Sequence, residues 1–243
     1  MGDSSRPGGP PLRGASGDTF AALLDRLKRR GTSVLVVGDL SGDLERALSR
    51  RMMGAPSETR YRLLASLKPT GSPGRWFPDS VTPDDEWVDL VEGCELARDG
   101  AATTAPDPGP PESGATGSPG GGVVDRIEDW VDAVDAEAAP GPGELRVGVA
   151  SLDVLLERDG VDAPRRAAER VHDLMREHQG VAHLYFPRPR SSRVVQQTTV
   201  WVDVVVEVRT SEGRPEQRWS VQDTVETSWF PIRDDEPHHR VDR

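Results

Sequence analysis

Apolar residues recur along the chain at spacings that predict alternating helices and strands. The first stripe has the i, i+3, i+4, i+7 spacing of a helical face and consists of Phe20, Leu23, Leu24 and Leu27. We expect this helix to begin at a cap, Asp18, and to end before Gly31. Residues 33–37 are then almost continuously apolar, which is typical of a buried parallel strand.

The same alternation continues to the end of the chain. A second helical stripe consists of Leu44, Ala47, Leu48 and Met52, and a third consists of Val124, Ile127, Val131, Val134 and Ala138. A further helix is predicted to begin after Asp162, whereas residues 191–201 fit a helix or a strand. Further strands are predicted at residues 61–67, 86–91, 145–149, 181–186 and 204–208.

Strands that alternate with helices indicate βαβ units, so we predict an α/β fold of three layers around a mostly parallel sheet. Residues 211–214 have the composition of a hairpin turn and lead into a strand at residues 216–221. This C-terminal hairpin would add antiparallel strands to the sheet. Residues 227–232 form a last extended piece that could cover an edge.

Three segments contain few large apolar residues and are expected to lie outside the folded core. Residues 1–17 predict a disordered tail, residues 99–122 a disordered insertion rich in Gly and Pro, and residues 233–243 a polar tail. We therefore expect one α/β domain over residues 18–232.

The charge pattern indicates the kind of cell in which the protein works. The 30 Lys and Arg residues against 41 Asp and Glu residues give a net charge of −11, and Lys28 and Lys68 are the only lysines. An acid excess with little lysine is typical of proteins that stay soluble at molar salt, where an acidic surface repels itself little. A GC-rich genome alone explains the arginines but not the net charge. We expect a haloarchaeal protein that makes no direct contact with nucleic acid.

The cellular compartment is predicted from the sequence signals for membranes and secretion. No apolar run is long enough for a transmembrane helix, and residues 1–17 have no secretory core. Cys94 is the single cysteine, which excludes an internal disulfide and a multi-cysteine metal site. We therefore expect a cytoplasmic protein without membrane contact.

A glycine-containing loop follows the first predicted strand and precedes a helix, which is the context of a phosphate-binding P-loop. It contains Gly38, Asp39, Ser41, Gly42 and Asp43. A working P-loop places its second glycine one residue later, followed by Lys and then Ser or Thr. Here Asp43 takes the position of the Lys, and its carboxylate would repel a phosphate. A plain βα turn with Asp43 as the helix cap is the alternative.

The segment at residues 145–156 resembles the strand and Asp-Ser-Leu stretch of RecA-superfamily ATPases of the KaiC-like branch. In that family the Asp belongs to the Walker B motif and serves Mg²⁺. Here Ala150 takes the matching position, followed by Ser151. The later helices, strands and hairpin are also similar, as they are in a group of haloarchaeal proteins of unassigned function. The resemblance implies a RecA/KaiC-like fold over residues 18–232, without the insertion.

Loss of the P-loop Lys and the Walker B Asp removes the groups that stabilise phosphoryl transfer. The first hypothesis is therefore a non-catalytic pseudo-ATPase that acts as a regulatory or protein-interaction module, and the resemblance implies a signalling role. The alternative is a nucleotide-binding protein or unorthodox ATPase in signalling or recombination. We expect protein partners, no cofactor and no bound metal, and the oligomeric state stays open.

Other combinations carry weaker hypotheses. Ser151, His172 and Asp203 have the composition of a Ser-His-Asp triad but lack a nucleophile elbow. Lys68 could approach the carboxyl edge of the sheet. The pairs at residues 76–77 and 229–230, each a Trp followed by a Phe, could form an exposed patch for a partner.

Overall fold

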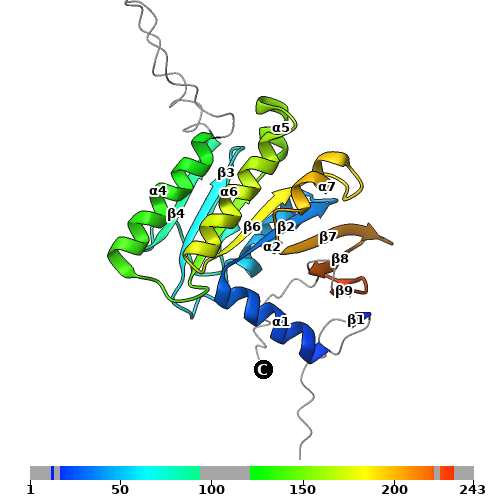
Figure 1. The fold of residues 1–243 in the computed structure, drawn as a ribbon, viewed down its shortest axis with the longest axis horizontal. Helices are drawn as coiled ribbons and strands as arrows, with labels where there is room; N and C mark the ends of the chain where they lie inside the picture. The colour runs from blue at the N-terminus through cyan, green and yellow to red at the C-terminus, as the bar shows by residue number, and fades with distance from the viewer. Residues whose placement is uncertain (1–11, 14–16, 94–120, 222–224, 233–243) are drawn as a thin grey trace, which may run out of the picture.

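The computed structural model describes residues 12–13, 17–93, 121–221 and 225–232. Its elements form a mixed sheet with helices on both faces (Figure 1). In chain order they are β1 (Leu12–Arg13), α1 (Gly17–Arg30), β2 (Thr32–Gly38), α2 (Gly42–Met52), β3 (Tyr61–Ser66), the 3-10 helix η1 (Pro73–Trp76), β4 (Val88–Glu92), α4 (Gly121–Ala138), β5 (Leu145–Ala150), α5 (Asp153–Asp159), α6 (Ala163–Glu177), β6 (Val181–Phe186), α7 (Arg193–Thr199), β7 (Val204–Ser211), β8 (Arg214–Val221), β9 (Val225–Thr227) and β10 (Phe230–Pro231).

The strand order in the sheet is β1-β9-β8-β7-β2-β6-β5-β3-β4, and β10 also pairs with β8. The strands from β7 to β4 in this order are parallel. The hairpin of β7 and β8 then turns the sheet antiparallel. The α/β class, the mostly parallel sheet and the C-terminal hairpin are therefore confirmed.

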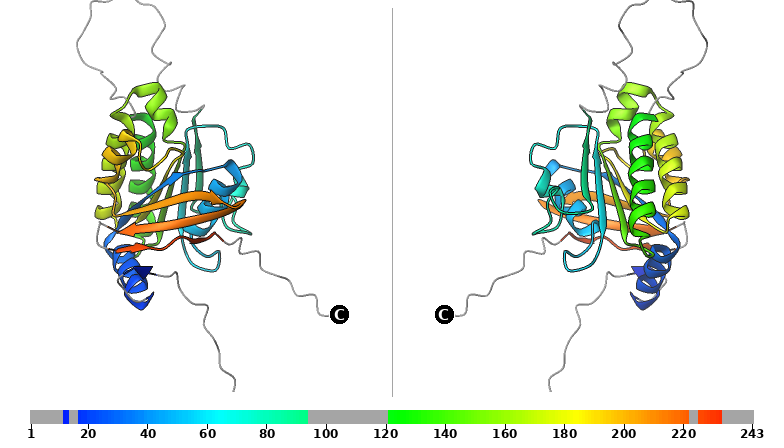
Figure 2. Two further views of the ribbon diagram at one scale, coloured as in Figure 1. Left: turned by 90° about the vertical axis from the view of Figure 1, so that its right-hand side faces the viewer. Right: turned by 90° about the vertical axis from the view of Figure 1, so that its left-hand side faces the viewer.

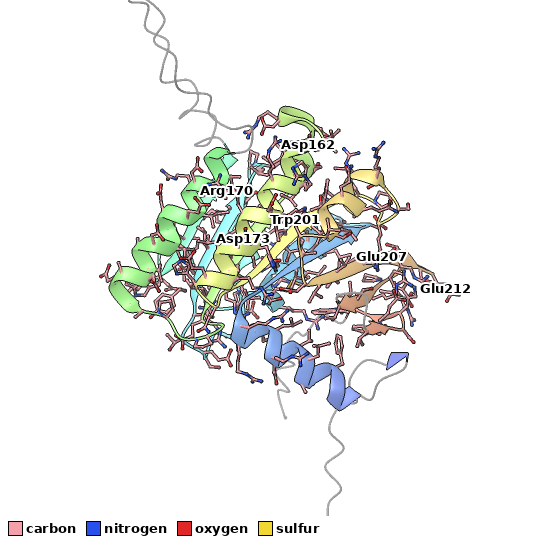
Figure 3. All side chains as sticks on the ribbon, viewed as in Figure 1. Asp162, Arg170, Asp173, Trp201, Glu207 and Glu212 are labelled. Atoms are coloured by element: carbon pink, nitrogen blue, oxygen red, sulfur yellow. The ribbon has the colours of Figure 1, made fainter. Side chains whose placement is uncertain are left out.

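The two faces of the sheet are covered by different sets of helices (Figure 2). Helices α4, α5, α6 and α7 pack on one face, against alternate residues of β2, β3, β5 and β6. Helices α1 and α2 and the turn η1 pack on the other face. On the first face Arg170, labelled in Figure 3, joins α6 to α4 through Glu128 and Asp125, at 2.6 and 2.7 Å.

Local details differ from the sequence-based predictions at several places. Residues 191–201 contain a helix, α7, because Val195 and Thr198 bury one helical face. Helix α4 begins at Gly121, so the last two positions of the predicted insertion are helical. Helix α1 begins at Gly17, one residue before the predicted cap. Trp76 and Phe77 are buried, at 5 and 0 % exposure, so the prediction of an exposed patch there is wrong.

Several predictions lie outside the described residues: the N-terminal tail except residues 12–13 and Gly17, residues 99–120 of the insertion, the C-terminal tail and Cys94. Within the described ranges, no helix combines the length and apolar character that a bilayer span requires. The same ranges contain no group of three or more His, Cys, Asp or Glu side chains placed to share a metal ion.

Candidate functional site

The loop between β2 and α2 opens at the carboxyl edge of the parallel strands, where α/β sheets bind their ligands. It begins at Gly38, whose φ of +110° lies in the region that favours glycine. A Cβ atom at this position would lie 2.0 Å from the backbone oxygen of Val208 on β7. Gly38 is therefore required by close contact with the neighbouring strand, which is a structural need independent of any phosphate.

The first three backbone amides of the loop donate inside the protein. The N–H of Gly38 donates to the carbonyl of Arg188 at 2.9 Å, and that of Asp39 to the carbonyl of Val208 at 3.1 Å. The N–H of Leu40 donates back to the Gly38 carbonyl at 3.0 Å. A P-loop holds phosphate with such amides. In this loop the first amides already have acceptors.

The loop is also tied to β7 through a side chain. The Thr210 hydroxyl donates to Asp39 Oδ2 at 2.7 Å. Together with the amide of Asp39, this bond fixes the loop against the strand next to β2. The arrangement resembles a rigid βα turn.

Helix α2 is capped by Ser41, so the prediction of Asp43 as the cap is wrong. Ser41 has extended backbone angles, and its side chain accepts from the Leu44 N–H at 3.4 Å. Gly42 opens the helix, which places Asp43 inside the first turn, where a carboxylate is favoured by the helix dipole. The serine two residues earlier has the geometry that capping needs.

Asp43 points to solvent, with 79 % of its side chain exposed, and is surrounded by arginines. Arg46 lies 2.5 Å and Arg75 3.6 Å from Asp43 Oδ1. The hydrogen bond and charge of Arg46 hold the pKa of the Asp43 carboxyl below its ordinary value. The position that corresponds to the P-loop Lys is thus a stably ionised carboxylate.

Ala150, at the Walker B position, is buried in an apolar cluster. Its methyl group lies with Met53, Trp76 and Phe77, which come from the end of α2 and from η1 and the residue that follows it. The neighbouring Ser151 is 8 % exposed and has a φ of +66°, which turns the chain sharply at the end of β5. The position that the resemblance matches to the Walker B Asp lies in an apolar cluster.

The carboxyl edge also carries a cluster of charged groups that we did not predict. Lys68 follows β3 and lies near this edge, as suggested, and its Nζ donates to Asp153 Oδ2 at 2.7 Å. Glu45 on α2 is 7 % exposed and lies close to both groups. Burial raises the pKa of Glu45 to about 7; the Asp153 carboxylate adds to this rise, and Lys68 and the Ser151 backbone N–H oppose it.

Glu45 could have been found from helical spacing. Residues 45, 48, 49 and 52 have the same spacing as a buried face, and Glu45, Leu48 and Ser49 are the buried residues of α2. The stripe that we identified began one residue earlier, at Leu44, which lies at the edge of this face. Because Glu is charged, an apolar stripe does not include position 45.

The structure separates Ser151 from the other two members of the suggested triad, whereas His172 Nδ1 and Asp203 Oδ2 lie 3.8 Å apart. Ser151 follows the carboxyl end of β5, whereas Asp203 precedes β7 at the opposite edge of the sheet. His172 instead lies 2.8 Å from the hydroxyl of Ser33, which is fully buried. Asp203 accepts from Arg30 and Thr32, both at 3.0 Å. These contacts join α1, β2, α6 and β7 and have no nucleophile open to solvent.

The sites proposed from the sequence therefore come together only in part. Gly38, Asp39, Ser41, Gly42 and Asp43 lie on one loop, and Ala150 and Ser151 end a parallel strand two places away in the sheet. The comparison with curated proteins finds no match. Residues 31–208 match the profile of a family of unknown function, DUF7504. Since this match covers more than half of the chain, the protein belongs to that family.

Proposed function

We propose that the chain is a non-catalytic, RecA/KaiC-like pseudo-ATPase domain that acts as a regulatory or protein-interaction module. The observation that carries this proposal is the loop after β2, whose amides at Gly38, Asp39 and Leu40 donate within the protein. In a P-loop, amides and a Lys together neutralise the phosphates. This loop offers a carboxylate at Asp43 instead.

The position of β2 supports the resemblance to this superfamily. β2 lies inside the sheet between β6 and β7. The next strand in the chain, β3, lies on the β6 side of β2, next to β4. The loop after such a strand lies at the switch point where open α/β sheets bind ligands. The fold thus offers the position of a nucleotide site, while its residues lack the phosphate chemistry.

The Walker B position supports the loss of metal-assisted catalysis. A Mg²⁺ ion needs oxygen ligands, usually a carboxylate with water molecules. Ala150 presents a methyl group packed among Met53, Trp76 and Phe77. Lys68, the lysine nearest this edge, is paired with Asp153.

Thermal unfolding with and without Mg-ATP, Mg-ADP and Mg-GTP tests the proposal. A ligand at about 100 times its Kd stabilises a protein by about 2.7 kcal/mol, which shifts the midpoint by about 5–10 °C for a domain of this size. We expect no shift in the wild-type chain. A shift of that size would contradict the pseudo-ATPase proposal, and hydrolysis would be assayed next.

Nucleotide binding without a Lys is the second candidate, because Arg46 and Arg75 lie beside the loop at Asp43. Guanidinium groups bind phosphate well. If this function is correct, Mg-ADP stabilises the wild-type chain and Arg46→Met removes the effect. Under the first proposal, neither chain responds.

The module proposal also requires a protein partner in the cytoplasm of a haloarchaeon, to which the acid excess points. Tagged protein purified from such a host at molar salt should carry a partner in fixed stoichiometry. Recovery of the chain alone, at native expression level and after cross-linking, would argue against an interaction role.

A further inference from the structure

A cavity of about 430 Å³ lies on the face of the sheet that α1 and α2 cover, toward the amino ends of the parallel strands. Its floor is formed by Val34, Val181, His183 and Val204, which belong to β2, β6 and β7 or begin them. Leu24 and Leu27 of α1 close it from one side. It is distinct from the loop at Gly38, which lies at the opposite edge of the sheet.

Two buried polar side chains line this cavity without a partner. His183 is 0 % exposed, and neither Nδ1 nor Nε2 has a hydrogen-bond partner within the described residues. Arg146 is 6 % exposed, its Nε has no acceptor, and its guanidinium makes no ion pair within the same ranges. Buried polar groups normally have partners, so the guanidinium of Arg146 points to a missing one. The ring nitrogens of His183 are themselves inaccessible from the cavity.

The contrast with Arg62, on the strand next to Arg146, shows how a satisfied buried guanidinium looks in this protein. Arg62 is 4 % exposed and donates to the carbonyls of Met53, Ala55 and Arg60 at 2.9–3.2 Å. Those bonds hold the chain after α2, which borders the cavity. Arg146 faces the same region but has no such carbonyls.

The space for His183 is created by a glycine on the neighbouring strand. Gly148 lies opposite His183 in the register of β5 and β6, and a Cβ atom there would lie 2.8 Å from His183 Nε2. The ring also lies edge-on to Tyr185, with centroids 5.4 Å apart. Burial, with a contribution from Arg146, lowers the pKa of His183 to about 3, so its ring is neutral and offers one donor and one acceptor.

The charges around the cavity favour an anion although the whole chain is acidic. Two of the lining cations have carboxylate partners: Lys28 Nζ lies 3.8 Å from Asp25, and Arg60 lies 2.9 Å from Glu58. Arg51 also lines the cavity but is exposed, whereas Arg146 is the buried lining cation and makes no ion pair within the described residues. Burial lowers its pKa to about 10, so it stays charged at neutral pH.

The rest of the lining is apolar, including Met52 of α2 and Trp219 of β8. A volume of about 430 Å³ lies in the lower part of the range of small-molecule pockets, which is about 300–1,000 Å³. One buried guanidinium matches one carboxylate, which it can hold with two parallel hydrogen bonds. We infer that this cavity binds a small organic carboxylate with an apolar body, its carboxylate at Arg146.

This inference adds a site that the proposed function does not use, so each can fail without the other. The walls from α1 and Trp219 lie outside residues 31–208, whereas Arg146 and His183 lie inside the part that matches the family. The polar centre of the site therefore belongs to the family region, and the flanking segments close it.

Calorimetric titration of the full chain with 2-naphthoate, and with the neutral 2-naphthalenemethanol, tests the inference. We expect saturable binding of naphthoate at one site with a Kd below about 1 mM, and binding of the alcohol weaker by about tenfold or more. Arg146→Met should weaken naphthoate binding by about tenfold or more, because it removes a buried polar contact. Arg126→Met, an exposed arginine of α4 on the other face, is the control and should bind as the wild type does.

Circular dichroism of each variant establishes that it is folded. If Arg146→Met does not fold, the comparison of the two ligands decides the matter. Absence of saturable naphthoate binding to the wild-type chain would overturn the inference. Equal binding of the acid and the alcohol, or unchanged affinity in the folded Arg146→Met variant, would overturn it as well.

Discussion

Replacing Glu45 with Gln should change how the stability of the protein depends on pH. Glu45 lies in the buried face of α2, close to Asp153 and Lys68, and its pKa is raised to about 7 in the folded protein. In the unfolded chain the same carboxyl titrates near 4.5. Between these values the unfolded state loses the proton while the folded state keeps it.

The sign and size of the effect follow from this difference. Below about pH 4.5 both states hold the proton, and Glu45 does not alter the free energy of unfolding. From pH 4.5 to about 7 the unfolded state ionises first, so stability falls as pH rises, by about 3 kcal/mol in total. Above pH 7 both states are ionised, and the loss is complete.

Urea unfolding at pH 5 and pH 8, at constant ionic strength, measures this effect. Glu45→Gln cannot ionise, so it should be more stable relative to the wild type at pH 8 than at pH 5, by up to about 3 kcal/mol. Glu137→Gln, an exposed position on α4, is the control and should follow the wild type at both pH values. If the difference between Glu45→Gln and the wild type is the same at both pH values, the burial argument for Glu45 is wrong.

Three further predictions concern the local structure and are checked by urea unfolding. Gly38→Ala should lower the free energy of unfolding by about 3–5 kcal/mol, because the added Cβ meets the Val208 oxygen. The control Gly71→Ala, with φ +68° and no atom within 4 Å of the added Cβ, should lower it by about 1 kcal/mol. Equal losses would contradict the close approach at Gly38. Asp203→Ala should cost about 2–4 kcal/mol, because its buried oxygens accept two hydrogen bonds, and a neutral result would contradict that role. Ser41→Ala should cost about 1 kcal/mol, and Asp43→Ala should cost less, because it removes only an exposed contact with Arg46 and the helix dipole; the reverse order would restore Asp43 as the cap.

The spacing of apolar residues predicted most of the fold. Strands buried on both faces have continuous apolar runs, and helices that pack on a sheet have an apolar residue at every third or fourth position. Residues 33–37 and 181–186 proved to be strands whose side chains are almost all buried on both faces. The hairpin turn was recognised from its composition, which includes a glycine; Gly213 has a φ of +74°, which suits glycine, whereas Glu212 adopts +50° although Glu is not favoured there. Residues 191–201 stayed ambiguous, since β-branched residues fit a helix when one face is packed, as in α7.

The sites were less predictable, because the groups involved are distant in the sequence. The Lys68 and Asp153 pair joins the ends of β3 and β5. Arg146 and His183 share a cavity only because their strands are neighbours and α1 packs over them. Trp76 and Phe77 looked exposed in a segment rich in polar residues, but they close over Ala150. Such contacts depend on the strand order and on helix packing, which a local pattern does not contain.

The central claim is that the loop at Gly38 has kept its place in the fold but lost its affinity for phosphate. The most direct test is a calorimetric titration of the wild-type chain at molar KCl with Mg-ATP, with the Arg46→Met variant alongside. The account predicts no saturable heat in either chain. Saturable binding to the wild type with a Kd below about 1 mM, lost in Arg46→Met, would contradict it and identify a nucleotide site.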